Sequence, residues 1–364
     1  MAEVRFEKVG KVYDKKVQAV EDLSFTCQDG EFFAILGPSG CGKSSSLRML
    51  AGLEEITSGD VCIKGRRVND MSPRERNVAM SFENYGLYDM SIFDNIAYPL
   101  KIHKVPKDQI TKQVTDMARR LHLTNVLGAK PSSLSSGQKQ RVSIARALVR
   151  NPDVTIMDEP LSHLDARMRN SMRSIIRHIH DQLHLTTVYV THDQIEAMTM
   201  ADKILIMNEG HLQQVGTPDE VYYYPDNMFV AGFVGSPQMN FVECRTQIQD
   251  GHVRVVHGQS ICFDADKYDD QISEGQEITL GFRPHDVLLS EKPRADYSKG
   301  SVYVVEPLGE STIISIKVDD LLIKAEIDGN VYSWTPDEDV FFKLDNERCH
   351  LFDQNTAKRI VSKR

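Results

Sequence analysis

The chain has 364 residues, of which 41% are hydrophobic and 26% are charged, and its formal net charge is −9. These values are ordinary for globular proteins, and the length favours two folded domains. The acidic balance and the lack of a basic cluster argue against nucleic acid as a partner. The N-terminal sequence MAEVRFEKVG has no signal-peptide pattern, and no apolar run is long enough to span a bilayer. The six cysteines lack CxxC spacing, which favours reduced thiols and predicts no structural metal.

Apolar runs with β character alternate with helical segments from the N-terminus to about residue 235. The runs are EFFAIL (31–36), DVTIMD (153–158), TTVYVTH (186–192) and KILIMN (203–208). This alternation predicts an α/β domain over residues 1–235 with a mostly parallel sheet. Apolar residues at helical spacing in 108–123 and 135–150 predict an inserted helical subdomain, which we place at about 84–150.

The pattern changes after GSPQMNF (235–241). Short alternating segments such as EITLGF, TIISIKV and VFFKL are separated by turn residues through the rest of the chain. Regular short strands of this kind predict an all-β second domain over residues 236–364, built as a small barrel or sandwich. We expect the joint at the Gly-Ser-Pro sequence, 235–237.

The segment ILGPSGCGKSS fits the phosphate-loop pattern G-x-x-x-x-G-K-[ST] between an apolar strand and a helix that we expect from about Ser45. In such a loop, backbone N–H groups and the N-terminus of the helix surround the phosphates, and the lysine reaches the terminal ones. The Ser44 hydroxyl is a candidate Mg²⁺ ligand. The candidate ATP-binding residues here are Gly37, Pro38, Ser39, Gly40, Cys41, Gly42, Lys43, Ser44 and Ser45.

Two carboxylates end the run VTIMDE (154–159), where a parallel sheet presents ligand-binding groups. By itself, an apolar run followed by two acids favours a strand that ends in a solvated turn. Coupled to the phosphate loop, it indicates that Asp158 holds Mg²⁺ and that Glu159 accepts a proton from the water that attacks the γ-phosphate of ATP.

The sequence LSSGQ (134–138) directly precedes a predicted helix and, taken alone, indicates no more than a serine-rich helix cap. With the two earlier motifs in this order, it makes the chain resemble the ATP-binding-cassette (ABC) ATPases. The resemblance implies a shared site in which one subunit contacts ATP held by the other. The residues implied for that contact are Ser135, Ser136, Gly137, Gln138 and Asp165.

The resemblance extends over nearly the whole chain. It implies that His192 is the histidine that orients the attacking water and the glutamate, although a lone histidine at a strand end is more often structural. It implies that Tyr13 stacks on adenine, with packing in the core as the alternative. The segments AGFVGSPQMNF, GFRPHDV and VVEPLGE are similar to the β extension of ATPases that serve carbohydrate and glycerol-phosphate import, which implies an OB-like second domain.

The stretch FENYGLYDM (82–90) departs from the family pattern, because Glu83 stands where the family usually has a glutamine that senses Mg²⁺. A carboxylate is a good Mg²⁺ ligand, but an ionised Glu83 without metal would repel the γ-phosphate by about 1–4 kcal/mol at about 4 Å. The alternative is an acid that faces solvent. Further departures are Ser136 for glycine, His163 for asparagine, and a stretch after Glu83 that is one residue shorter, with Asp89 where the family has Pro-His.

The family's ATPases dock onto membrane subunits near this stretch, so we expect an exposed apolar patch for that purpose, with core packing as the rival explanation. Its residues are Tyr85, Leu87, Tyr88 and Met90. The resemblance implies ATP and Mg²⁺ as ligands, two transmembrane permease subunits, a second ATPase subunit and, indirectly, an extracytoplasmic solute-binding protein. It places the chain at the cytoplasmic face of the cell membrane.

Three questions stay open at this stage. The pair of ATPase subunits can be a homodimer or a heterodimer, and the imported solute can be a sugar, an oligosaccharide or a glycerol-phosphate compound, or else a polyamine or inorganic ion. The β domain can also bind a regulator. A mechanochemical ATPase that acts on DNA or ribosomes fits less well, because the chain carries an all-β tail and no basic field.

Overall fold

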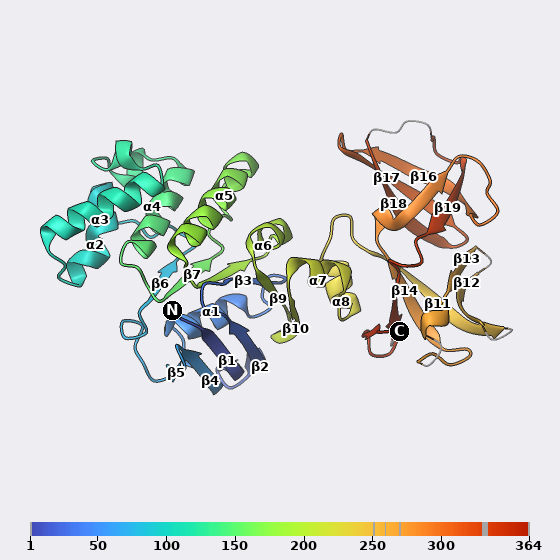
Figure 1. Cartoon of the computed structure of the whole chain (residues 1–364), viewed down its shortest axis with the longest axis horizontal. Coiled ribbons are helices and arrows are strands. Elements are labelled where there is room, and N and C mark those ends of the chain that lie inside the picture. Colours follow the sequence, from blue (N-terminus) through green and yellow to red (C-terminus); the bar gives the residue numbers. More distant parts are fainter. Residues whose placement is uncertain (1, 250–251, 259, 269–270, 330–333, 363–364) are drawn as a thin grey trace. The chain divides into compact units, whose positions relative to one another are not determined.

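The computed structural model describes residues 2–249, 252–258, 260–268, 271–329 and 334–362. The chain folds into two compact units, Met1–Pro218 and Asp219–Arg364 (Figure 1). No helix among the described residues is long and apolar enough to cross a membrane. All six cysteines are free thiols.

A six-stranded sheet organises the first unit, with strand order β10-β9-β3-β8-β7-β6. Its strands are β3 (Phe32–Leu36), β6 (Val78–Ser81), β7 (Val154–Asp158), β8 (Thr187–Thr191), β9 (Lys203–Asn208) and β10 (His211–Gly216). All neighbours pair in parallel except β9 and β10. The four predicted apolar runs are therefore strands, and the predicted parallel sheet is confirmed. Because helices cover both faces of such a sheet, its central strands are apolar throughout, as the fully buried β3 is.

A second sheet in this unit is antiparallel, with strand order β2-β1-β4-β5. Its strands are β1 (Val4–Tyr13), β2 (Val17–Cys27), β4 (Ser58–Ile63) and β5 (Arg66–Arg67). The side chains of Phe6, Phe25 and Phe33 stack in sequence, and this stack connects the antiparallel sheet to β3 of the parallel sheet. The two sheets share one hydrophobic core with helix α1 (Lys43–Ala51).

The helices of the subdomain lie together on one side of the first unit (Figure 1). It contains α2 (Ile92–Ile102), α3 (Lys107–Arg120), the 3₁₀ turns η1 (Thr124–Val126) and η2 (Pro131–Ser133), and α4 (Ser136–Leu148). Each helix of the subdomain packs against the other two. Two more helices complete the unit, α5 (Ala166–Leu183) and α6 (Gln194–Met200).

The second unit begins earlier than the sequence suggested. Two short helices, α7 (Pro218–Tyr223) and α8 (Met228–Phe233), precede its strands. The buried guanidinium of Arg283 explains why they belong to the β unit. It donates hydrogen bonds to the carbonyl oxygens of Tyr222, Ala231 and Val234, and it stacks on the Tyr222 ring. The compact units thus divide at 218/219, whereas the predicted joint lay at 235–237.

The rest of the second unit is two antiparallel sheets, with strand orders β13-β12-β11-β14-β20-β21 and β15-β19-β16-β17-β18. The first sheet contains β11 (Asn240–Gln249), β12 (His252–His257), β13 (Ile261–Asp264), β14 (Glu277–Phe282), β20 (His350–Asp353) and β21 (Arg359–Ile360). The second contains β15 (Val287–Ser290), β16 (Ser298–Pro307), β17 (Ser311–Val318), β18 (Leu321–Asp328) and β19 (Asp339–Leu344), and the 3₁₀ turns are η3 (Asp266–Tyr268) and η4 (Pro284–Asp286). One apolar core joins both sheets, so the predicted all-β domain is confirmed.

Candidate active site

The candidate site lies at the carboxyl ends of the parallel strands, because β3, β8, β7 and β6 are neighbours in that order. The phosphate loop follows β3, His192 follows β8, Glu159 follows β7 and Glu83 follows β6 after Phe82. The carboxyl ends of parallel strands meet at one edge of a sheet, so four predicted segments lie side by side. The fold rather than the sequence makes them neighbours.

The phosphate loop has the tight backbone that a cradle for phosphate needs. Gly40 and Gly42 have φ values of 81° and 103°, in the left-handed region that glycine adopts readily. A Cβ at Gly37 would lie 2.2 Å from the carbonyl oxygen of Met207, so only glycine fits there. Helix α1 begins at Lys43, directly after the loop and two residues before the predicted start at Ser45, and its N-terminus faces the loop.

Lys43 is buried, and its ammonium group folds back onto the loop. Its Nζ donates to the carbonyl oxygens of Gly37 and Pro38, both at 2.8 Å. A phosphate group offers stronger acceptors than these neutral carbonyls, so bound ATP would draw the same Nζ toward its terminal phosphates. Without bound ATP, the two carbonyls keep the ammonium group of Lys43 inside the loop.

Ser44 and Asp158 supply an oxygen pair suited to Mg²⁺. The Ser44 hydroxyl donates to Asp158 Oδ1 over 3.3 Å. Burial raises the pKa of Asp158, and the negative charges of Glu159 and Glu83 raise it further, while the bond from Ser44 lowers it. A hard divalent cation would relieve this crowding of carboxylates, and hydroxyl and carboxylate oxygens are its preferred ligands. The residues present therefore fit the Mg²⁺ that the sequence predicted.

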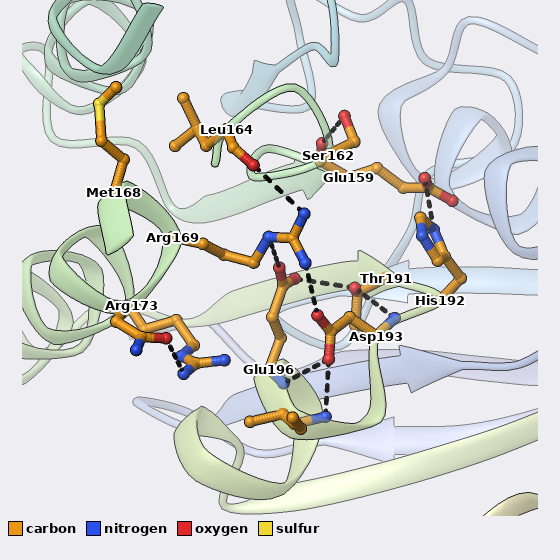
Figure 2. A network of polar contacts seen from close by, with 12 residues as sticks. Glu159, Ser162, Leu164, Met168, Arg169, Arg173, Thr191, His192, Asp193 and Glu196 are labelled. Carbon is orange, nitrogen blue, oxygen red and sulfur yellow. Dashed lines mark hydrogen bonds and ion pairs between the residues drawn. The ribbon is translucent and has the colours of Figure 1, made fainter. Parts of the chain in front are cut away.

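Glu159 and His192 face each other across the ends of β7 and β8. His192 Nδ1 lies 2.8 Å from Glu159 Oε2 (Figure 2). Glu159 has a φ of 43°, which is strained for a side chain of its size. The Glu159 N–H donates to the Val190 carbonyl at 2.9 Å, and the Glu159 carbonyl accepts a hydrogen bond from Ser162 Oγ at 3.0 Å. These two bonds hold the turn that presents its carboxylate.

Glu83 is exposed to solvent on one side and faces the loop after β7 on the other. Its Oε1 lies 3.4 Å from Ser162 Oγ, which shares its one proton with the Glu159 carbonyl, and 3.6 Å from His163 Nε2. About half of the side-chain surface of Glu83 and of His163 is exposed, so the pair is partly hydrated. Two departures from the family pattern, the acid at 83 and the histidine at 163, thus lie together between the ends of β6 and β7.

The residues predicted to contact a partner's ATP lie at two helix starts. Ser135 caps α4, where its Oγ accepts from the Gln138 N–H and the Gln138 side chain accepts from the Ser135 N–H. Both bonds belong to a capping box. Ser136 is the first residue of α4, and a Cβ at Gly137 would lie 2.7 Å from Met168 Sδ, a flexible contact. Asp165 caps α5 and accepts from the Met168 N–H.

Tyr13 lies at the end of β1, partly buried. Its hydroxyl donates to Ser45 Oγ at 3.2 Å, and the ammonium of Lys11 lies 4.7 Å from its ring centre. Tyr13 is therefore close to the start of α1, on the side where the phosphate loop ends. This position is compatible with the predicted stacking on adenine, which stays a prediction.

The residues of the predicted apolar patch differ in exposure, and their docking role stays a prediction. Tyr88 is exposed, at 48% of its surface, whereas Tyr85, Leu87 and Met90 are half-buried. The buried Asn95 holds this stretch, because its amide donates to the carbonyls of Tyr88 and Met90 and its Oδ1 accepts from the Tyr88 N–H. Tyr98, Phe82 and Ile102 are exposed apolar neighbours that the sequence analysis did not name.

Sequence reasoning also missed four polar residues that support the site. Arg146 of α4 donates to the carbonyls of Tyr85 and Gly86, and burial lowers the pKa of its guanidinium. Arg169 and the buried Glu196 belong to the polar network around Asp193, the residue that follows His192 (Figure 2). Asn95 in α2 and Glu196 in α6 are polar residues at buried helix positions, which was the one signal in the sequence that could have indicated them.

Comparison with known proteins places this geometry among known ATPases. Residues 20–162 match the family described as ABC transporter, and residues 235–287 match the MalK OB fold domain. The oligosaccharides import ATP-binding protein MsmX of Bacillus subtilis is 43% identical over 99% of this chain and 100% of its own length. The sn-glycerol-3-phosphate import ATP-binding protein UgpC of Vibrio cholerae is 42% identical over 97% of this chain and 94% of its own.

A solved structure shows the same fold for the ATPase part. It is cbiO1 from Clostridium perfringens, part of the ABC transporter complex cbiONQ, with 27% identity and a TM-score of 0.57. The match covers 60% of this chain and 89% of that one.

Proposed function

The chain belongs to the ABC transporter family, and from that premise we propose that it is the ATP-hydrolysing subunit of an importer for a sugar, an oligosaccharide or a glycerol-phosphate compound. The observation that carries the proposal is the 2.8 Å contact between Glu159 and His192 at the edge of the sheet where the phosphate loop ends. The names of the relatives supply the direction of transport and the class of solute.

The side chains divide the chemistry between them. Lys43 and the N-terminus of α1 bind the phosphates of ATP, and Ser44 and Asp158 hold Mg²⁺, which neutralises charge on the phosphates when it is bound. Glu159 accepts a proton from the attacking water, and His192 fixes the orientation of that carboxylate. Ser135 and the start of α4 contact the ATP of a second subunit, where backbone N–H groups stabilise negative charge.

The partners follow from the same proposal. Two permease subunits bind near Tyr88, and the ATPase lies at the cytoplasmic face of the membrane as a peripheral subunit. The loop from Glu83 to Met90 connects β6 of the catalytic sheet to α2, so a shift at the nucleotide moves the docking surface. A solute-binding protein outside the membrane delivers the solute to the permease.

Activity of the purified chain tests the enzymatic part of the proposal. We expect Mg²⁺-dependent ATP hydrolysis that falls by a factor of about 10³ in Glu159→Gln, because the amide cannot accept the proton. The Glu159→Gln protein should still bind a fluorescent ATP analogue with unchanged affinity. Hydrolysis that survives in Glu159→Gln would refute the assigned role of this residue.

Isolation of the chain from its native membranes tests the transport part. Tagged protein, solubilised gently, should carry two membrane subunits that mass spectrometry identifies. A second, different ATPase chain in the complex would show a heterodimer, and its absence would show a homodimer. Loss of sugar or glycerol-phosphate uptake in a deletion strain fixes the solute class, whereas loss of polyamine or ion uptake, or the absence of any membrane subunit, contradicts the proposal.

A further inference from the structure

Arg169 on the first turn of α5 connects two loops of the candidate site. One guanidinium nitrogen donates to the Leu164 carbonyl oxygen at 3.2 Å, and the other donates to Asp193 Oδ2 at 3.1 Å (Figure 2). The Nε of Arg169 lies 4.0 Å from Glu196 Oε1. One side chain thus contacts the loop after β7 and the loop after β8.

The two contacted residues each adjoin a residue of the proposed mechanism. Leu164 directly precedes Asp165, which caps α5 and is predicted to contact the partner's ATP. Asp193 directly follows His192. A movement of either loop would therefore change the contacts of Arg169, and through them the position of the other loop.

The carboxylates around Arg169 belong to a largely buried network, in which the Nε of Arg169 itself makes no hydrogen bond among the described residues. Glu196 is 3% exposed, and it accepts hydrogen bonds from Tyr189 Oη at 2.7 Å and Thr191 Oγ1 at 2.8 Å. Asp193 caps α6 by accepting from the N–H groups of Ile195 and Glu196. Burial raises the pKa of Glu196, and the guanidinium opposes that shift. Removal of Arg169 would leave two adjacent carboxylates without their cation.

We propose that Arg169 is a positioning residue, which sets the His192 ring against Glu159 by holding Asp193 and links that placement to the loop that carries Asp165. The inference rests on the proposed function for its catalytic consequence. Its structural part, the placement of His192, does not depend on ATP hydrolysis. Arg169 itself touches neither Glu159 nor His192 among the contacts of the described residues, so it acts through its neighbours.

The kinetic test compares Arg169→Ala with Arg173→Ala, a matched control one turn further along α5. The side chain of Arg173 donates a hydrogen bond to Oδ1 of the exposed Asn170, on the same helix. Arg169→Ala should lower kcat about tenfold and leave the KM for ATP unchanged, because the phosphate loop still binds the nucleotide. Arg173→Ala should leave both unchanged, and Arg169→Lys should recover part of kcat. Equal losses in both alanine variants would overturn the proposal.

A double variant shows whether Arg169 works through His192. On a His192→Ala background, Arg169→Ala should cost no more than about twofold further, because the ring it positions is gone. An undiminished tenfold loss on that background would overturn the proposal. A rise in KM equal to the fall in kcat would also do so, since it would indicate a general loosening of the nucleotide site.

A measurement without ATP separates this inference from the proposed function. In protein labelled at histidine nitrogen, the NMR signal of His192, assigned by its loss in His192→Ala, should move in Arg169→Ala and stay in Arg173→Ala. If it does not move, Arg169 does not position His192. If it moves in a protein that hydrolyses no ATP, the proposed function fails and the positioning role stands.

Discussion

Replacement of Glu83 by glutamine tests how charge at the end of β6 acts on catalysis. The carboxylate lies 3.6 Å from His163 Nε2 and 3.4 Å from Ser162 Oγ, and its charge contributes to the raised pKa of Asp158. An amide keeps a partner for Ser162 but removes the charge. We expect Glu83→Gln to hydrolyse ATP faster than the wild type, because less negative charge then opposes the phosphates.

The distance to His163 sets the size of the coupling between the two side chains. When the imidazole is protonated, the pair of unit charges at 3.6 Å interacts by about 1 kcal/mol at the dielectric constant of water. The solvent-like value applies because about half of each side chain is exposed. Such an energy corresponds to a change of about fivefold in rate. In a buffer acidic enough to protonate the imidazole, His163→Asn should therefore slow hydrolysis, since it leaves the charge of Glu83 uncompensated.

The assay is steady-state ATP hydrolysis over a range of Mg²⁺ concentrations for the wild type, both single variants and the double variant. In the acidic buffer, the effect of Glu83→Gln at saturating Mg²⁺ should be about fivefold larger on the His163→Asn background than on the wild type. Asp89→Asn is the matched control, because it removes an acid from the same stretch that pairs with Lys130 instead. Additive effects would refute the pairing, and slower hydrolysis with a higher Mg²⁺ requirement in Glu83→Gln would show that Glu83 is a metal ligand.

Three further predictions concern the two units. Ser135→Asp should keep the helix cap and the stability of α4 but abolish hydrolysis, because its charge would face the partner's ATP. Ser135→Ala, which removes the cap, should lower the unfolding free energy by about 1 kcal/mol. Urea denaturation and ATP hydrolysis of both variants check this prediction. Arg283→Met should destabilise the second unit by about 3 kcal/mol, because three carbonyls lose their donor. The loss of stability is measured by denaturation followed through the fluorescence of the single tryptophan, Trp334. An unchanged denaturation midpoint would refute the role of Arg283. Burial lowers the pKa of His350 to about 4, so the second unit should lose about 2 kcal/mol between pH 7.5 and pH 5, as the unfolded chain takes up a proton that the folded one refuses. His350→Gln should remove most of that loss in the same denaturation assay, and equal acid sensitivity in the variant would contradict the assignment.

The sequence predicted best what depends on short uninterrupted patterns. The run at 203–208 and β9 have the same bounds, and β14 coincides with EITLGF, because a buried or alternating strand shows its environment in its own residues. The phosphate loop was equally visible, because the spacing of its glycines and Lys43 is a contiguous pattern, and Gly40 and Gly42 adopt left-handed φ values. Such patterns can be recognised without knowing the distant neighbours, such as Met207 beside Gly37, that the fold supplies.

Features that depend on distant pairing were not predictable. The antiparallel sheet joins β1 to β4 across more than forty residues of sequence. The boundary at 218/219 depends on Arg283, which is bonded to carbonyls more than forty residues before it. Likewise, nothing in the sequence near Arg169 points to Asp193, because a charged residue on a helix is usually solvated.

The order of the strands explains why a single charge at position 83 can act on both catalysis and coupling. Because β8, β7 and β6 are neighbours, His192, Glu159 and Glu83 follow one another along the edge of the sheet. Glu83 contacts the loop of Glu159 through Ser162, and it begins the stretch that Asn95 and the subdomain hold. A change at Glu83 therefore reaches the catalytic turn through the contact with Ser162, and the docking loop through the backbone that leads to Tyr88. Variants that alter hydrolysis without altering transport, or the reverse, should accordingly lie in Ser162 or in Asn95, and not in Glu83.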